Sequence, residues 1–252
     1  MKTREKIIIS LIAIILGIIS YVYFLDGYYS IDTEWIYTRG IFDYATKDAY
    51  IKNGRLFSAI IFILFSFMNL SIKKIYIINL LASILISSIS VVKIYKIINK
   101  YKSLEKTYLK IIAFMISYIF IFNFTQINIM LFIDSAIINA SILFLISSLE
   151  KTIIEEKKKQ GFLYALIAIF CYQGTIPVYI ATAFLICLLK YKKINKTFFK
   201  ELIIPAIIII LACILNLITI LLIPYITELD FTERLPINGM MTEFLYNLQK
   251  FY

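Results

Sequence analysis

One segment, "YYSIDTEWIYTRGIFDYATKDAYIKNGR" at residues 28–55, concentrates charged side chains whose types could do chemistry together. A carboxylate can take a proton from a hydroxyl group, while a guanidinium or ammonium group can hold the oxygens of a phosphate. The five candidates are Asp32, Glu34, Arg39, Lys52 and Arg55. The alternative is that the acids are solvated loop residues and that the cations reach toward ordinary anionic lipid headgroups. Arg55 is the preferred phosphate ligand, because it follows Gly54, where backbone can approach a ligand closely.

The chain contains no histidine, which excludes a histidine triad, a histidine-ligated metal and imidazole acid–base chemistry. Any catalysis must therefore use carboxylates, Lys, Arg, Tyr or a bound ion. The three cysteines fall inside apolar runs, where a thiol behaves as a small hydrophobic group, so no disulfide is indicated.

Asp134 interrupts an apolar run in the motif "LFIDSA" (131–136). A charge at membrane depth is costly, so such a residue is a functional candidate by default. The alternative is an internal partner, such as a lysine or a backbone group. Three polar residues just before it are expected to form a polar rim that faces the ligand. They are Asn123, Gln126 and Asn128.

The motif "YQGTIP" (172–177) breaks the apolar run 162–190. Its Gly and Pro are explained by the geometry of a turn alone. The phenol of Tyr172 and the amide of Gln173 are the better candidates for hydrogen bonds to a ligand, although Gln at a helix end is common.

Composition places the 252-residue chain among polytopic membrane proteins, because 61% of its residues are hydrophobic and its mean hydropathy is +0.86. The net charge of +10 comes from lysines that form short clusters between apolar runs. That pattern indicates the positive-inside arrangement of membrane proteins and argues against nucleic acid as a partner.

The lysine-rich connections 93–106, 150–160 and 190–200 predict the topology, because all three should lie in the cytoplasm with the basic N-terminus. The loop 26–74 and the tail 225–252 are then external, and the run 56–72 is expected to lie along the outer interface or dip into it without crossing. The expected fold is all-α in one integral membrane domain with seven crossings. They are 7–25, 75–98, 108–124, 129–149, the two arms of 162–190, and 201–224.

Four motifs in order resemble the bacterial glucosyltransferase II family, which modifies O-antigen and cell-envelope polysaccharides and has a GT-C-like fold. They are "SIDTEW", "NGR" at the start of the interfacial helix, "LFIDSA" and "YQGTIPVYIA". Many members carry a paired acid where this chain has Asp32, Thr33 and Glu34, so either carboxylate can correspond to it. Members are usually longer, which implies that these 252 residues are an N-terminal module.

The resemblance implies transfer of a hexose, with glucose expected, from a polyprenyl-phosphate donor to an envelope polysaccharide or glycolipid. The reaction would take place among membrane lipids on the outer face of a bacterial cytoplasmic membrane. The implied catalytic residues are Asp32 and Glu34, and the implied substrate-binding residues are Arg39, Lys52, Arg55, Asp134, Tyr172 and Gln173. No cofactor or metal ligand is assigned, and dependence on a divalent metal is left open.

Two other interpretations stay open. A transporter or lipid-carrier flippase would need ionisable residues near the bilayer midplane in several spans and paired broken helices. The chain shows one buried acid near the end of a span and no convincing repeat. An inactive, truncated scaffold is the third interpretation.

Overall fold

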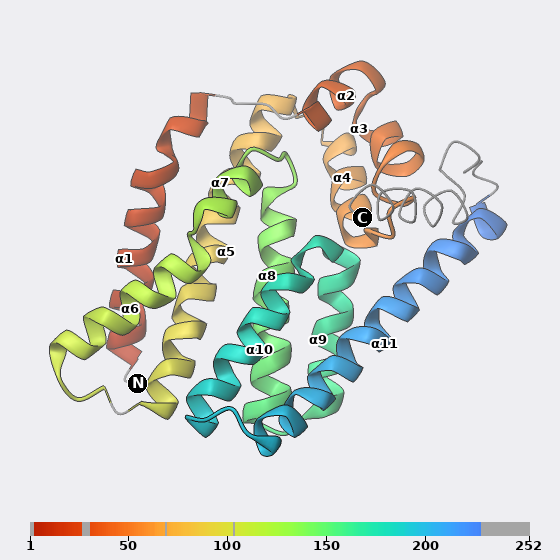
Figure 1. Ribbon diagram of the computed structural model, residues 1–252. Coiled ribbons are helices and arrows are strands. Elements are labelled where there is room, and N and C mark those ends of the chain that lie inside the picture. The colour runs from red at the N-terminus through yellow and green to blue at the C-terminus, as the bar shows by residue number, and fades with distance from the viewer. Residues whose placement is uncertain (1–2, 27–30, 69, 103, 228–252) are drawn as a thin grey trace, which may run out of the picture.

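The computed structural model describes residues 3–26, 31–68, 70–102 and 104–227, and within these ranges the chain is helical with no strand. The expected all-α class is therefore confirmed. Helices of different length run between two ends of one bundle (Figure 1). The predicted external tail 225–252 lies outside the described residues from 228 onward.

The chain begins with α1 (Thr3–Tyr21) and the 3₁₀ turn η1 (Val22–Asp26). The short elements of the charged segment follow, namely α2 (Ile31–Arg39), α3 (Ile41–Asp43) and the π-helical turn η2 (Tyr44–Asp48). Next come α4 (Leu56–Phe67), α5 (Ile72–Tyr101), α6 (Thr107–Ile121) and α7 (Phe124–Met130). The remaining elements are α8 (Ser135–Leu149), η3 (Glu150–Ile154), α9 (Lys158–Cys171), η4 (Gln173–Thr175), α10 (Ile176–Tyr191) and α11 (Lys196–Thr227).

Helix α8 forms the centre of the bundle and packs most extensively against α5 and α9. Small residues make this close approach possible, because they let helix backbones come near each other without bulky side chains between them. The buried serines of α5 and α8 are Ser83, Ser87, Ser88, Ser90, Ser135, Ser141, Ser147 and Ser148. At the α8–α9 contact, Gly161 leaves room for the Thr152 hydroxyl and the Ser148 carbonyl.

In the part of the chain that the structure describes, five helices are long and apolar enough to cross a membrane, by length and composition. They are Arg4–Leu25, Ile72–Tyr101, Ser135–Ile154, Gln173–Tyr191 and Lys196–Ile223. The two other predicted crossings correspond to α6 and α9, with 15 and 14 residues. At 1.5 Å per residue each spans only about 22 Å, less than a hydrocarbon core of roughly 30 Å. The count of seven crossings therefore stays a prediction.

Helix α4 corresponds to the segment that we expected not to cross. Its 12 residues extend over about 18 Å. Figure 1 shows it rising from the level of the α9–α10 turn to the end of the bundle where α5 begins. At its lower end the Ser58 hydroxyl donates to the Cys171 carbonyl at 3.1 Å, which ties α4 to the end of α9.

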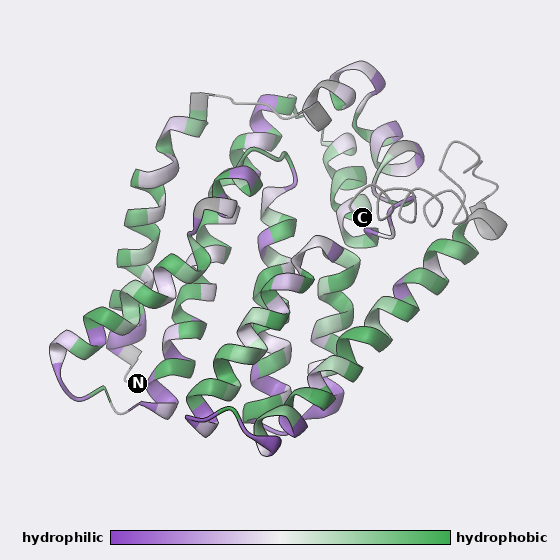
Figure 2. Ribbon diagram, in the orientation of Figure 1, coloured by the Kyte–Doolittle hydropathy of each residue, from purple (hydrophilic) through white to green (hydrophobic). Residues whose placement is uncertain are grey.

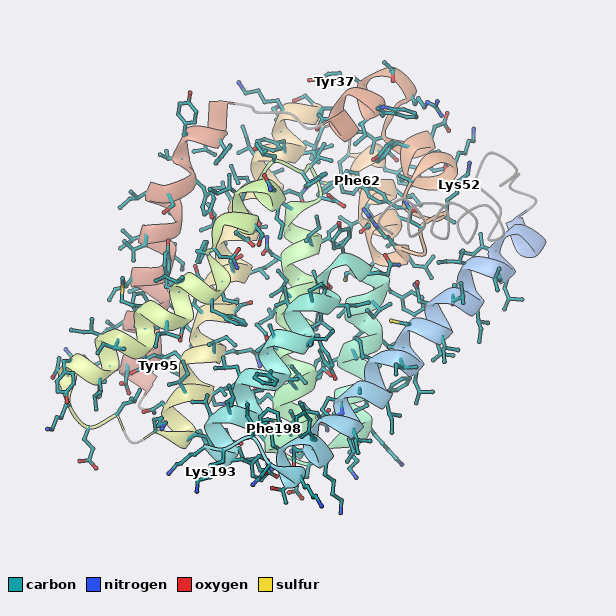
Figure 3. All side chains as sticks on the ribbon, viewed as in Figure 1. Tyr37, Lys52, Phe62, Tyr95, Lys193 and Phe198 are labelled. Atoms are coloured by element: carbon teal, nitrogen blue, oxygen red, sulfur yellow. The ribbon has the colours of Figure 1, made fainter. Side chains whose placement is uncertain are left out.

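The three lysine-rich connections meet at one end of the bundle, which we call the lysine-rich end (Figure 2). Lys193 points away from the helices there (Figure 3). Carboxylates neutralise part of this positive charge: Glu150 pairs with Lys93 and Lys96, both at 2.8 Å. On the surface beside them, hydrogen bonds from Lys151 and Lys157 lower the pKa of Glu155 to about 2.

The topology predicts which positions a membrane-impermeant thiol reagent reaches from outside intact cells. In a cysteine-free background, Lys47→Cys on the exposed turn of the charged segment should be labelled strongly. Lys100→Cys and Lys158→Cys should be labelled only after the membrane is permeabilised, because both lie at the lysine-rich end. Strong labelling of either position in intact cells would contradict the predicted orientation.

Candidate functional site

Arg55 occupies the position immediately before α4 and is held between an acid and an aromatic ring. Its Nη1 atom lies 3.7 Å from Oδ2 of Asp134, and the two side chains are 23% and 5% exposed. The centre of its guanidinium group lies 4.3 Å from the centroid of the Tyr172 ring. The three residues come from segments far apart in the sequence, and a cation between a carboxylate and an aromatic face is stabilised by both.

Asp134 lies at the N-terminus of α8, where its carbonyl accepts hydrogen bonds from the N–H groups of Ile137 and Ile138 at 2.9 and 3.1 Å. Its carboxylate is therefore near the positive end of the helix dipole. The contact with Arg55 provides the internal partner expected if Asp134 has only a structural role. It leaves the functional interpretation open, since Arg55 is itself a candidate ligand for phosphate.

Tyr172 is the residue at which the helix breaks between α9 and η4, with extended backbone angles. The Ser141 hydroxyl on α8 lies within hydrogen-bond distance of the carbonyls of Ala168 (2.9 Å) and Tyr172 (3.1 Å), so the break leaves buried carbonyls satisfied. The Tyr172 ring lies over Gly174, where an added Cβ would be 2.5 Å from a ring carbon. The break and the glycine together aim the ring at Arg55.

Gln173 belongs to a chain of amides that fixes the turn before Arg55. Its Nε2 donates to the Asn53 carbonyl at 2.8 Å and to Oδ1 of Asn216 at 3.0 Å. The Nδ2 of Asn216 donates in turn to the Gly54 carbonyl at 2.8 Å. Gln173 therefore positions Arg55 through the backbone, and its role as a sugar ligand stays a prediction. Asn216 is a site residue that sequence reasoning missed, although an asparagine inside the apolar run 201–224 was a usable signal.

The guanidinium group of Arg55 retains hydrogen-bonding capacity. The contact with Asp134 is longer than a close charge-assisted hydrogen bond. Within the described part of the chain, the buried Nε of Arg55 has no hydrogen-bond partner, and neither has the buried hydroxyl of Ser135 next to Asp134. An acceptor-rich ligand such as a phosphate would supply the missing partner for Arg55.

Arg39 and Lys52 are the other two cations that the sequence predicts as phosphate ligands. Arg39 lies over the Trp35 ring at 4.6 Å and lines a different cavity, of about 590 Å³, with Asp43, Ser66 and Ser71. The half-buried Lys52 precedes the turn that carries Arg55, and its side chain lies at the edge of the molecule in Figure 3. Their predicted roles in substrate binding stay predictions.

The two predicted catalytic acids, Asp32 and Glu34, have their backbone in α2. Their side chains lie outside the described residues. Helix α2 belongs to the end of the bundle opposite the lysine-rich end, the end toward which α4 rises from Arg55 (Figure 1).

The expected polar rim at 123–128 is wrong in one respect, because Gln126 faces the interior and is only 1% exposed. Its Nε2 donates to Oδ1 of Asn139 on α8 at 2.6 Å and to the Ser87 hydroxyl on α5 at 3.2 Å. Asn123 caps the first turn of α7. This buried network joins α5, α7 and α8 one turn from Asp134 and so holds the start of α8 in place.

Among the residues that the structure describes there is no group of three or more His, Cys, Asp or Glu side chains that could hold a metal ion. Comparison with known proteins finds no matching family model, no matching curated protein and no matching solved structure. The resemblance to the bacterial glucosyltransferase II family therefore stays a prediction that rests on the four motifs and their order.

Gly54→Ala is expected to destabilise the protein by roughly 2–4 kcal/mol, because it combines backbone strain with a clash. Gly54 has φ of +68°, and an added Cβ would lie 2.7 Å from Ile220 and 2.8 Å from Nδ2 of Asn216. Gly40→Ala is the matched control, since Gly40 also has a positive φ, of +88°, but none of the described residues lies within 4 Å of the added atom.

Thermal unfolding of both variants in detergent measures the difference. The control carries only the backbone strain of its φ of 88° and ψ of 154° and should lose about 1–3 kcal/mol, less than Gly54→Ala. Equal losses would show that Asn216 and Ile220 do not pack against this turn as described.

Proposed function

We propose that the chain is a membrane glycosyltransferase that moves a hexose from a polyprenyl-phosphate donor to an envelope polysaccharide or glycolipid. The observation that supports this most is the cluster of Arg55, Asp134 and Tyr172, with Gln173 tied to the backbone beside it. The resemblance implied all four as substrate-binding residues, and they come together from three separate parts of the sequence.

The chemistry assigned to the cluster is stabilisation of the leaving phosphate. The acceptor hydroxyl oxygen attacks the anomeric carbon, and the bond between that carbon and the phosphate oxygen breaks with its electron pair going to the phosphate. Arg55 offers hydrogen bonds and positive charge to that phosphate as its charge grows. A carboxylate of α2, Asp32 in the preferred assignment, takes the proton of the acceptor hydroxyl.

An apolar groove supports a lipid-linked donor over a soluble one. The groove lies between α10 and α11, has a volume of about 560 Å³, and is lined by apolar side chains that include Ile176, Ala206 and Leu217. Ile176 follows the turn that contains Gln173, and Leu217 follows Asn216, so the groove starts beside the polar cluster. A donor bound with its phosphate at Arg55 would have this groove available for its isoprenoid chain.

Filling the groove tests the proposal. Ala206→Trp places a large side chain in it, whereas Ala181→Trp, at an exposed position on α10 outside the groove lining, is the matched control. We expect Ala206→Trp to weaken binding of a long-chain donor about threefold to tenfold. The effect is modest because the bilayer is as apolar as the groove, so the groove stabilises the lipid chain only through closer van der Waals packing.

The measurement is binding of a labelled polyprenyl-phosphate hexose to the purified protein, repeated with a short-chain analogue that cannot fill the groove. The analogue should bind both variants equally. Loss of binding for the short analogue as well, or equal binding of the long donor to both variants, would contradict the assignment of the groove.

A further inference from the structure

A second cleft lies at the lysine-rich end, far from Arg55 along the bundle, between α1, α5 and α6. It has a volume of about 730 Å³. One wall is apolar and includes the exposed Ile8 and Ile12 of α1 and Ile111 and Phe114 of α6. Its rim is polar and carries Arg4, Glu5, Asn99 and Lys110. The buried Tyr95 also lines this cleft and is labelled toward the lower end of the bundle in Figure 3.

A smaller cavity of about 350 Å³ adjoins this cleft, because Asn99 lines both. Three lysines surround the smaller cavity, namely Lys6 of α1 and Lys96 and Lys100 of α5. We call the two together the basic cleft: the smaller cavity with its lysines is the cationic mouth, and the larger cleft carries the apolar wall.

The acids of the basic cleft are already engaged. Glu5 accepts from Lys110 at 3.2 Å and from the Tyr95 hydroxyl at 3.1 Å. Glu150 accepts from Lys93 and Lys96, both at 2.8 Å.

Three cations remain in the basic cleft: Lys6 and Lys100 line its mouth, and Arg4 lines the larger cleft. None of them has a carboxylate within ion-pair distance in the described part of the chain. Lys6 and Lys100 line the same cavity, and like charges that share a cavity repel one another unless an anion lies between them, so the mouth is complementary to an anion.

We propose that the basic cleft binds an anionic glycerophospholipid, with its phosphate between Lys6 and Lys100 and an acyl chain along Ile8, Ile12 and Phe114. The apolar wall favours a lipid over a free phosphate ion, which would leave that wall uncovered. Basic pockets between membrane helices bind anionic headgroups by this combination of charge and apolar contact. The site lies at the end of the bundle away from the Arg55 cluster and does not depend on the proposed transfer reaction.

The test is lipid retention by the purified protein, measured by native mass spectrometry after incubation with phosphatidylglycerol or phosphatidylcholine. The variant Lys6→Gln/Lys100→Gln removes two cations from the mouth. The matched control Lys73→Gln/Lys74→Gln removes the same charge from exposed positions at the other end of α5. Circular dichroism and gel filtration check that both variants fold as the wild type does.

We expect the wild type to retain phosphatidylglycerol in preference to phosphatidylcholine, and the cleft variant to lose that retention about tenfold or more, since each surface cation contributes measurably to anionic-lipid binding. The control variant should retain phosphatidylglycerol as the wild type does. Equal retention by wild type and cleft variant, or equal loss in cleft and control variants, would overturn the proposal. Displacement of phosphatidylglycerol by millimolar inorganic phosphate would overturn the assignment of a lipid as the occupant.

Discussion

Arg55→Ala is expected to weaken binding of a polyprenyl-phosphate hexose about a hundredfold. One part of the loss is the charge-assisted hydrogen bonds to the phosphate, worth roughly 1–3 kcal/mol. The other part comes from Asp134, whose carboxylate is 5% exposed and would face the phosphate without its cation. Each 1.4 kcal/mol corresponds to about a factor of ten in affinity, so the two parts together give this magnitude. Arg55→Lys keeps the charge but loses the planar fork, and we expect about a tenfold loss.

Donor binding to the purified protein measures this effect, and Arg39→Ala is the matched control. Arg39 carries the same charge but lies over Trp35 beside a different cavity, so its loss should change donor affinity less than about threefold if the cluster alone holds the phosphate. The double variant Arg55→Ala/Asp134→Asn should recover part of the stability lost in Arg55→Ala, because it also removes the buried charge that Arg55 had faced, without recovering binding. Equal donor binding by Arg55→Ala and the wild type would reject Arg55 as the phosphate ligand.

Asp32→Asn is expected to lower the rate of hexose transfer by roughly 10²–10⁴ while leaving donor binding nearly intact. The substitution keeps the shape of the side chain and removes its ability to accept a proton. No imidazole is available to replace it, because the chain has no histidine. Transfer rates in membranes with matched expression levels measure the effect.

Glu34→Gln is the matched control for Asp32, because either acid of the Asp32-Thr33-Glu34 motif can correspond to the paired acids of the resembled family. Wild-type transfer by Asp32→Asn together with an inactive Glu34→Gln would move the catalytic role to Glu34. Full activity of both variants would reject the mechanism proposed for this segment.

The residues of the cluster could be predicted from the sequence, but their contacts could not. Asp134 and Tyr172 were visible because each breaks an apolar run, and Arg55 because it follows a glycine. Their meeting depends on how the start of α4 packs beside α8 and the α9–α10 turn, which no local pattern encodes. Arg39 shows that closeness in sequence does not predict closeness in space: it belongs to the same charged segment as Arg55 but lines a separate cavity.

Helical phase explains why Gln126 was misplaced. The cluster 123–128 was treated as one polar surface, but residues two positions apart on a helix point about 200° apart. Gln126 therefore faces the interior with Asn139 while Asn128 is exposed. The lengths of α6 and α9 also could not be predicted, because these short helices depend on packing around α8 rather than on their own hydropathy.

The most direct test of the account is the fate of a doubly labelled donor in proteoliposomes that contain only the purified protein, the donor and a polysaccharide or glycolipid acceptor. The account predicts that the hexose label appears on the acceptor and that free polyprenyl phosphate forms in equal amount. It also predicts that Arg55→Ala loses both products in parallel. Movement of the intact donor from one leaflet to the other, with its sugar–phosphate bond unbroken in the presence of acceptor, would contradict the account and identify a lipid carrier instead.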